Sequence, residues 1–207
     1  MSLLPTESGL PPEPALESPA QKPNARLWAL AREIIETIIL TIVIYAVVNF
    51  ATGRFRVEGE SMLPTLHPNE YVLIDKVSYM LGSPERGDIV VFHYPLGTER
   101  DFIKRVIGLP NETVSIANGV ITITRADGQQ EVLQEPYIAS QPHYQGTWTL
   151  KSDEFFVLGD NRNNSSDSHS WGTLQRSYLV GRAVIVYWPL EALQWVPHHD
   201  YASASTP

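Results

Sequence analysis

The sequence feature that most constrains this chain is an uncharged, strongly apolar segment from Thr37 to Gly53. As an α-helix its 17 residues would be about 25 Å long. A bilayer's hydrocarbon core is about 30 Å thick, so a spanning helix needs one more turn on the amino-terminal side. Apolar residues are available there, namely Trp28, Leu30, Ile34 and Ile35. We therefore expect a single transmembrane helix over residues 26–53, in contact with the lipid bilayer.

Two other interpretations of this segment are a buried core helix and a cleaved signal peptide. The signal peptide is disfavoured because the apolar stretch is long and no small-x-small cleavage site follows it. Basic residues flank the segment on both sides, at Arg26 and Arg32 before it and at Arg54 and Arg56 after it. This balance leaves the orientation open under the positive-inside rule.

The rest of the chain divides by composition. Residues 1–25 are rich in Pro, Glu, Ser and Ala, which predicts a disordered tail, and residues 198–207 are predicted to be a flexible C-terminal tail. Between them, short runs rich in Val, Ile, Phe and Tyr alternate with the turn-forming pairs Gly87–Asp88, Asn118–Gly119 and Asp127–Gly128. Residues 54–197 are therefore predicted to form an antiparallel β-rich domain, and the fold class is mainly β.

Composition excludes several kinds of chemistry. The chain has no cysteine, so it can form neither a disulfide nor a thiolate zinc site, and it has no cysteine nucleophile. Its formal net charge is −8 and no basic face is visible in the sequence. Nucleic-acid binding usually depends on such a face, so we expect no nucleic-acid partner.

Ser61 is the strongest candidate nucleophile. It lies in FRVEGESMLPTLHPNE, directly after a strand-like run. Gly59 permits a positive φ or a close backbone approach, and Pro64 and Pro68 stiffen the loop that follows. A serine in this position can present its hydroxyl and its backbone N–H together. A lone serine is nevertheless more often a surface residue than a nucleophile.

Lys104 is the candidate base that would activate the serine hydroxyl. It lies in DFIKRVIGLP, where Lys104 and Arg105 would point to opposite faces of a strand, so one of them must face the interior or a cleft. Burial lowers the pKa of a lysine, and a drop of about 2.4 units from about 10.4 leaves about half of it neutral at pH 8. The cost is about 3 kcal/mol of stability at lower pH. A strand lysine that reaches solvent is the alternative.

A third candidate element is the polar loop in FFVLGDNRNNSSDSHSWG, residues 155–172, which follows an apolar strand. Its charged residues Asp160, Arg162 and Asp167 are candidates to interact with Arg105. The loop also carries many amide and hydroxyl groups, more than a structural turn usually needs. An elaborate structural loop remains an equal alternative on these residues alone.

Together these segments resemble the bacterial type I signal peptidases. The matching stretches are the apolar segment, EGESMLPTL, GDIVVF, FIKRVIGLP and GDNRNNSSDSHSWG, in that order. The resemblance implies that Ser61 is the nucleophile and Lys104 the general base. It implies that Ser165 orients the lysine amine, that Asp167 supports the site, and that Arg105 forms an ion pair with Asp160. Substrate contacts are expected from Gly59, Met62, Leu66, Asp101, Phe102 and Ile103.

The resemblance also implies a reaction and a location. Members of the family remove N-terminal signal peptides from exported preproteins and cut after small residues at positions −1 and −3, without a metal or organic cofactor. The expected location is the cytoplasmic membrane, with the N-terminus cytoplasmic and the catalytic domain outside. Three positions depart from common family patterns: Gly59 replaces a hydroxyl residue found in some members, Asn163 an aspartate, and His169 an arginine.

Two other functions are compatible with parts of the sequence. One is a self-cleaving repressor-type Ser–Lys protease, which would share the dyad but be soluble and bind DNA. The other is a non-catalytic, membrane-tethered β-domain that binds exported partners. The apolar segment and the GDNRNNSSDS loop argue against the first, and the second has no use for Ser61 together with Lys104.

Overall fold

A computed structural model describes residues 23–97 and 100–201 of the chain, with side chains from residue 26 onward. The predicted disordered tail thus falls almost wholly outside the described residues, as do residues 202–207. The chain divides into two compact units with a boundary between Tyr45 and Ala46, and each is described by itself.

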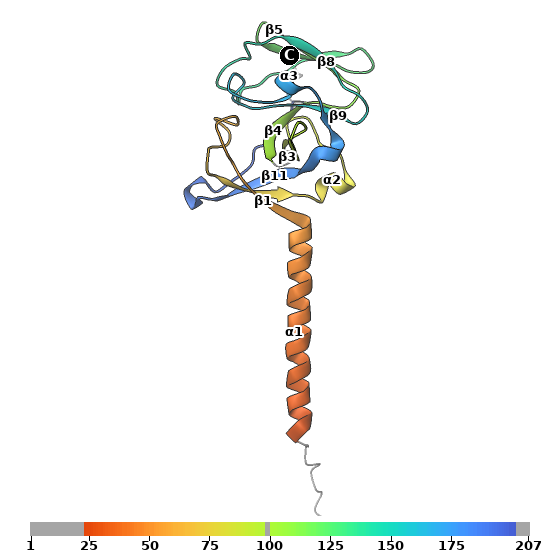
Figure 1. Cartoon of the computed structure of the whole chain (residues 1–207), viewed down its shortest axis with the longest axis vertical. Coiled ribbons are helices and arrows are strands. Elements are labelled where there is room, and N and C mark those ends of the chain that lie inside the picture. The colour runs from red at the N-terminus through yellow and green to blue at the C-terminus, as the bar shows by residue number, and fades with distance from the viewer. Residues whose placement is uncertain (1–22, 98–99, 202–207) are drawn as a thin grey trace, which may run out of the picture. The chain divides into compact units, whose positions relative to one another are not determined.

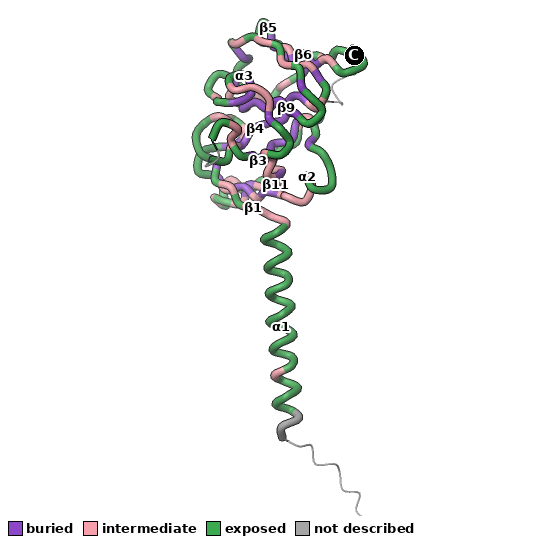
Figure 2. Tube along the Cα trace, turned by 45° about the vertical axis from the view of Figure 1, so that its right-hand side comes forward, coloured by how far each residue is buried: buried purple, intermediate pink, exposed green. Residues whose placement is uncertain are grey.

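The apolar segment forms one continuous helix, α1 (Pro23–Ala51). Residues 26–50 are exposed with one intermediate exception, Ala31. Figure 2 shows the exposed colour along almost the whole described length of α1. The stretch Arg26–Ala51 has 26 residues, which is about 39 Å of helix and long enough to cross a bilayer. No side chain between Arg26 and Ala51 is buried in the described structure, which is compatible with a helix that contacts lipid.

Polar side chains in α1 find partners within the helix. Thr37 Oγ1 donates to the carbonyl of Glu33 and Thr41 Oγ1 donates to the carbonyl of Thr37, each at 2.8 Å. Arg32 Nε lies 2.7 Å from Glu36 Oε1, one turn away. Internal pairing of this kind is what a helix needs where water is absent.

The second unit consists of two antiparallel sheets and a few short helices (Figure 1). The larger sheet contains, in spatial order, β1 (Thr52–Arg56), β2 (Tyr71–Asp75), β11 (Leu179–Trp188), β3 (Ile89–His93), β4 (Asp101–Gly108), β9 (Glu154–Leu158) and β10 (Leu174–Gln175), with β12 (Gln194–Trp195) paired to β11. The smaller sheet contains β7 (Gln130–Val132), β6 (Val120–Thr124), β5 (Thr113–Ala117) and β8 (Gly146–Thr149). The short helices are α2 (Ser78–Leu81), α3 (Ser168–Trp171), η1 (Arg176–Tyr178) and η2 (Leu190–Ala192). The predicted mainly β fold class is confirmed.

Local sequence accounts for the connections. The pair Asn118–Gly119 joins β5 to β6 with φ values of 51° and 79°, as a tight hairpin requires. Gly128 forms the turn between β6 and β7 with φ of 83°, and its N–H donates to the carbonyl of Arg125 at 2.9 Å. The turn-forming pairs therefore lie where the sequence predicted breaks between strands.

Strands β3, β4 and β9 of the larger sheet are buried on both faces. Along β3, Ile89 and Val91 belong to one apolar cluster, whereas Val90 and Phe92 belong to another. This explains why β3 has no exposed residue before His93, although a half-exposed strand would alternate. A third apolar cluster lies at the smaller sheet and includes Ile107 from the end of β4. Strand β4 therefore runs between separate cores.

The chain continues to pack beyond residue 197, where the predicted flexible C-terminal tail begins. His198 Nδ1 lies 3.1 Å from Asp88 Oδ1, and Tyr201 is only 4% exposed. The Tyr201 hydroxyl makes a hydrogen bond with Tyr137. Aromatic burial and a satisfied hydroxyl hold this end in place, so the packed region extends to Tyr201.

Candidate active site

Ser61 lies on a tight loop between β1 and β2. The loop is closed at its base by two hydrogen bonds, from Val57 N–H to the carbonyl of Glu70 at 2.8 Å and from Asn69 N–H to the carbonyl of Val57 at 2.9 Å. Gly59 has φ of 74°, as its lack of a side chain allows. The backbone thus turns sharply just before the serine.

The residues that follow Ser61 anchor the loop in the core. Met62 is 1% exposed and Leu66 is fully buried, and both belong to the apolar cluster shared with β2, β3 and β11. Leu66 N–H donates to the carbonyl of Met62 at 3.0 Å. Ser61 is therefore held by the packing of its neighbours rather than by its own side chain.

Lys104 projects from β4 toward this loop. Its Nζ lies 2.7 Å from Ser61 Oγ and donates to the carbonyl of Ile103 at 2.8 Å. The residue is 4% exposed, and Nζ lies 5.4 Å from the centroid of the Phe102 ring. The structure brings together the two residues that the sequence nominated as nucleophile and base.

Opposing effects set the pKa of Lys104. Burial is the largest effect and lowers it, whereas the negative charges of Asp167 and Asp160 raise it. The net result is a pKa of about 8, well below the usual 10.5. About half of Lys104 is then neutral at pH 8 and can accept a proton.

Arg105 points away from Lys104 and forms the predicted pair with Asp160. Arg105 Nε and Nη2 donate to the two Asp160 oxygens at 2.9 and 2.7 Å, and both side chains are almost completely buried. Burial would lower the pKa of Arg105, but the hydrogen bonds and charge of Asp160 raise it overall. The pair is bidentate, which fixes the orientation of the carboxylate.

The polar loop after β9 holds the backbone around Ser61. Asn161 N–H donates to the carbonyl of Ser61 at 3.0 Å, and Asn161 Nδ2 donates to the carbonyl of Glu60 at 3.1 Å. Thr65 Oγ1 donates to Asp160 Oδ2 at 2.5 Å. The same carboxylate that binds Arg105 thus also fastens the loop that carries Ser61.

Ser165 does not make the predicted hydrogen bond to Lys104. Its Oγ is buried and finds no partner among the residues that the structure describes. The Ser165 side chain lies against Gly159, whose Cα also lies against the carbonyl of Ser61. The lysine amine is instead held by the Ile103 carbonyl, which the sequence does not identify because every residue carries the same group.

Asp167 is completely buried and both of its oxygens are engaged. Oδ2 accepts from Gly159 N–H at 2.9 Å, and Oδ1 lies 2.6 Å from His169 Nδ1. Asp167 also caps α3, since Oδ1 accepts from the backbone N–H of His169. The carboxylate is therefore fixed beside the loop that contacts Ser61.

A cleft of about 660 Å³ opens onto the Ser61–Lys104 pair. Of the predicted substrate-binding residues, Gly59, Asp101, Phe102 and Ile103 line it. Met62 and Leu66 do not, because they are buried in the core beneath the serine. The assignment of these two residues to the substrate-binding surface stays a prediction.

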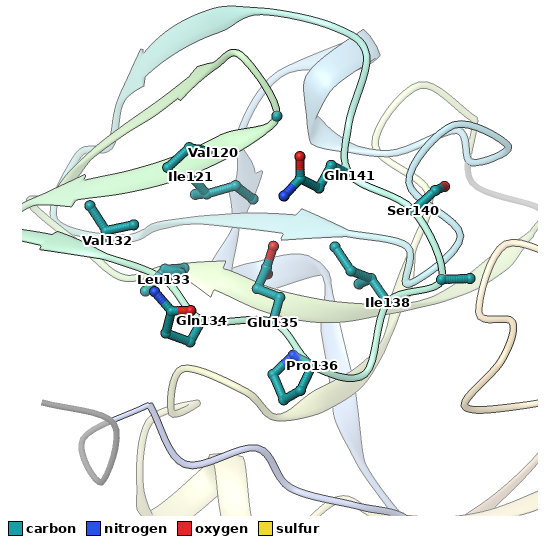
Figure 3. Close-up of a pocket in the computed structure, with 12 residues that line it drawn as sticks. Val120, Ile121, Val132, Leu133, Gln134, Glu135, Pro136, Ile138, Ser140 and Gln141 are labelled. Atoms are coloured by element: carbon teal, nitrogen blue, oxygen red, sulfur yellow. The ribbon is translucent and has the colours of Figure 1, made fainter.

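Another cavity, of about 570 Å³, lies at the smaller sheet (Figure 3). It is lined mainly by aliphatic and amide side chains, including Val120, Leu133 and Gln141. Its carboxylate, Glu135, is already paired with Arg162 at 2.5 Å. This cavity contains no paired nucleophile and base, so the cleft at Ser61 is the better candidate for catalysis.

Some supporting residues were missed in the sequence. Glu135 accepts two hydrogen bonds from Arg162, which is completely buried. The ring of Tyr137 lies 4.2 Å from the guanidinium carbon of Arg105. Both Glu135 and Tyr137 lie in an irregular segment far along the chain from Arg105, and nothing in that segment indicates these contacts.

Over residues 23–97 and 100–201 no three His, Asp or Glu side chains form a group that could hold a metal ion.

A buried lysine beside a serine hydroxyl at the edge of an open cleft is typical of serine peptidases with a lysine base. Comparison with known proteins agrees with this class. Residues 30–188 match the family described as "Signal peptidase, peptidase S26".

Curated relatives are similar over most of their length. The chain is 41% identical to "Signal peptidase I" of Leptolyngbya laminosa, over 91% of this chain and 94% of the relative. It is 39% identical to "Probable signal peptidase I-2" of a Synechocystis strain, over 82% and 78%. A crystal structure of a signal peptidase I from Enterococcus faecalis matches 48% of this chain and 95% of its own, with 29% identity and a TM-score of 0.42. The chain therefore belongs to the type I signal peptidase family and is a serine endopeptidase.

The buried lysine predicts a pH-dependent cost in stability. The pKa of Lys104 is about 8 in the folded chain and near 10.5 when unfolded, so the cost is full below pH 8 and disappears as the pH rises to 10.5. Lys104→Met should therefore raise the free energy of unfolding by up to about 3 kcal/mol at pH 6 and by little at pH 10.5. Urea unfolding in detergent at both pH values measures the difference.

The matched control is Lys76→Met, which replaces a lysine that is only partly buried after β2. The Lys76→Met substitution should give no pH-dependent gain in the free energy of unfolding. A Lys104→Met variant that is equally stable relative to the parent at pH 6 and pH 10.5 would contradict the burial cost.

Proposed function

We propose that this chain removes N-terminal signal peptides from exported preproteins, with Ser61 as nucleophile and Lys104 as general base. The observation that carries the proposal is the 2.7 Å distance between Ser61 Oγ and a buried Lys104 Nζ at an open cleft. A lysine amine in contact with a serine hydroxyl is the arrangement that proton abstraction needs.

The reaction proceeds through an acyl-enzyme. Neutral Lys104 accepts the hydroxyl proton as Ser61 Oγ attacks the scissile carbonyl, and the resulting ammonium protonates the departing amine. A water then attacks the ester carbonyl and gives its proton to Lys104, which releases the new carboxyl end and restores the serine. The backbone N–H of Ser61 is the proposed donor to the oxyanion.

The cleft suits an extended substrate. It is bounded by Phe55 and Gly59 on one side and by Asp101 to Lys104 on the other, so a peptide could lie along both segments as an additional strand. We propose that the cut follows small residues at positions −1 and −3, as the resemblance to the family implies. No metal or organic cofactor takes part in the proposed reaction.

A non-catalytic binding domain is a weaker interpretation. Burying a lysine costs folding stability, and a domain that only binds partners gains nothing from the cost. The burial that lowers the pKa of Lys104 is useful only if the neutral amine acts as a base. The self-cleaving repressor type is disfavoured by membership of the signal peptidase family.

We further propose that α1 anchors the enzyme in the cytoplasmic membrane. Its apolar side chains are exposed along its length, with Leu27 at 66%, Ile38 at 52% and Phe50 at 66%. Contact of such a surface with lipid is favourable, whereas its exposure to water would be unfavourable. Exported substrates become accessible outside the cytoplasm, which implies a cytoplasmic N-terminus and an external catalytic domain.

Removing either member of the pair should abolish processing. Ser61→Ala removes the nucleophile and Lys104→Ala removes the base, so each should lower the rate of preprotein cleavage by about 10³-fold or more. Incubation of the purified chain with a labelled preprotein, followed by gel analysis, measures the loss. The controls are Ser115→Ala on β5 and Lys76→Ala, both outside the cleft, which should retain parental activity. Full activity in the Ser61 or Lys104 variant would disprove the assignment.

Cleavage should also fall on acidification. With a pKa of about 8, the neutral fraction of Lys104 drops about tenfold for each pH unit below that value. At pH 6 we expect kcat/KM to be about 100-fold below its plateau. Enzyme held at pH 6 and returned to pH 8 should recover fully, which separates protonation from denaturation. A rate that stays constant down to pH 5 would argue against a lysine base.

The proposed topology can be tested by labelling because the chain has no cysteine. A membrane-impermeant maleimide applied to intact cells should label Ser152→Cys, which is in the external domain, but should label Ser8→Cys only after permeabilisation. Replacing both Ile39 and Ile42 by Lys should release the chain on alkaline carbonate extraction, since each charge at a helix centre costs about 2.5–3.5 kcal/mol. Labelling of Ser8→Cys in intact cells would place the N-terminus outside the cytoplasm and contradict the proposed orientation.

A further inference from the structure

His169 is held on two sides within the polar loop. Its Nδ1 lies 2.6 Å from Asp167 Oδ1, and its ring stacks on Tyr144 with the centroids 3.8 Å apart and the planes 10° from parallel. The side chain is 22% exposed, so the ring is largely enclosed by these contacts. These contacts fix the ring against the Asp167 carboxylate.

Asp167 connects this ring to the active site. It is completely buried, and its other oxygen accepts from Gly159 N–H at 2.9 Å. Gly159 lies against the carbonyl of Ser61. After burial, the charge of Asp167 is the strongest influence on the pKa of Lys104, and it raises that pKa.

We propose that His169 is a positioning residue that holds the Asp167 carboxylate, and that the charge of the side chain at position 169 sets the net charge that Lys104 experiences. This inference rests on the proposed function, because it concerns the base of that reaction. The mechanism does not otherwise use His169, which contacts neither Ser61 nor Lys104 in the described structure.

The sign of the effect follows from the charges. With a neutral side chain at position 169, the full negative charge of Asp167 favours the ammonium form of Lys104. With a cationic side chain there, its pair with Asp167 is close to neutral and that support is lost, so the neutral amine of Lys104 is favoured.

The other charged groups around the pair leave this effect intact. Asp160 is the second carboxylate that acts on Lys104, but it is bound to Arg105. Burial raises the pKa of Tyr144 far above the working range, so its hydroxyl stays neutral. Arg162 and Glu135 also act on Tyr144, and they are paired with each other.

The test compares the pH dependence of kcat/KM in two variants of the full chain in detergent. His169→Asn retains a donor near the position of Nδ1 but never becomes charged. His169→Arg is always charged. We expect the midpoint of the acidic limb to lie about half a pH unit to one unit higher in His169→Asn than in His169→Arg, with the parent between them. The substrate is a labelled preprotein peptide without groups that titrate between pH 5 and 9.

A matched control is His198→Asn. His198 also places Nδ1 near a buried carboxylate, at 3.1 Å from Asp88, but Asp88 is not among the charges that influence Lys104. Its acidic limb should coincide with that of the parent. Because the midpoint does not depend on the amount of active enzyme, partial loss of folded protein in any variant leaves the comparison valid.

Failure of the proposed function and failure of this inference give different results. If the parent chain shows no cleavage that depends on Ser61, the proposed function is wrong. If the parent cleaves but the His169→Asn and His169→Arg limbs coincide, or lie in the reverse order, His169 does not act on Lys104 and this inference is wrong.

Discussion

The burial of Lys104 is the constraint on which the rest of the site depends. In water a lysine is almost entirely charged at pH 8 and cannot accept a proton. Burial among the strands makes it neutral more often, whereas Asp160 and Asp167 limit how far its pKa falls. A much lower value would give a weaker base, and the usual value would leave almost no neutral amine. The two carboxylates therefore adjust the base as well as support the loop.

The same groups fix the position of Ser61, the proposed nucleophile. Asp160 binds Arg105 on one side and Thr65 on the other, so one carboxylate joins β4, which carries Lys104, to the loop that carries Ser61. Asn161 adds a backbone hydrogen bond to Ser61. The reacting atoms are thus held in place before substrate binds, which avoids a cost in orientation during the reaction.

Local pattern predicted the elements but not the contacts between distant segments. The uncharged segment, the Asn118–Gly119 hairpin and the opposite directions of Lys104 and Arg105 follow from residue type and spacing. The contacts of Glu135 and Tyr201 depend on tertiary packing between segments that lie far apart in the chain, and no local signal marks them. Ser165 shows the converse limit, because the resemblance predicted a hydrogen bond to Lys104 that this structure does not contain.

Several of the buried charged groups of the domain lie next to the Ser61 loop. The core of the smaller sheet is mainly aliphatic and aromatic. Next to the Ser61 loop, by contrast, Lys104, Arg105, Asp160 and Asp167 are all buried. Buried ion pairs seldom stabilise a protein more than apolar side chains of the same size would, and Lys104 costs stability outright below pH 8. A fold under selection for stability alone would replace these groups with apolar ones. The burial of Lys104 beside Ser61 is therefore best explained by the proposed reaction, which needs a neutral amine next to a hydroxyl.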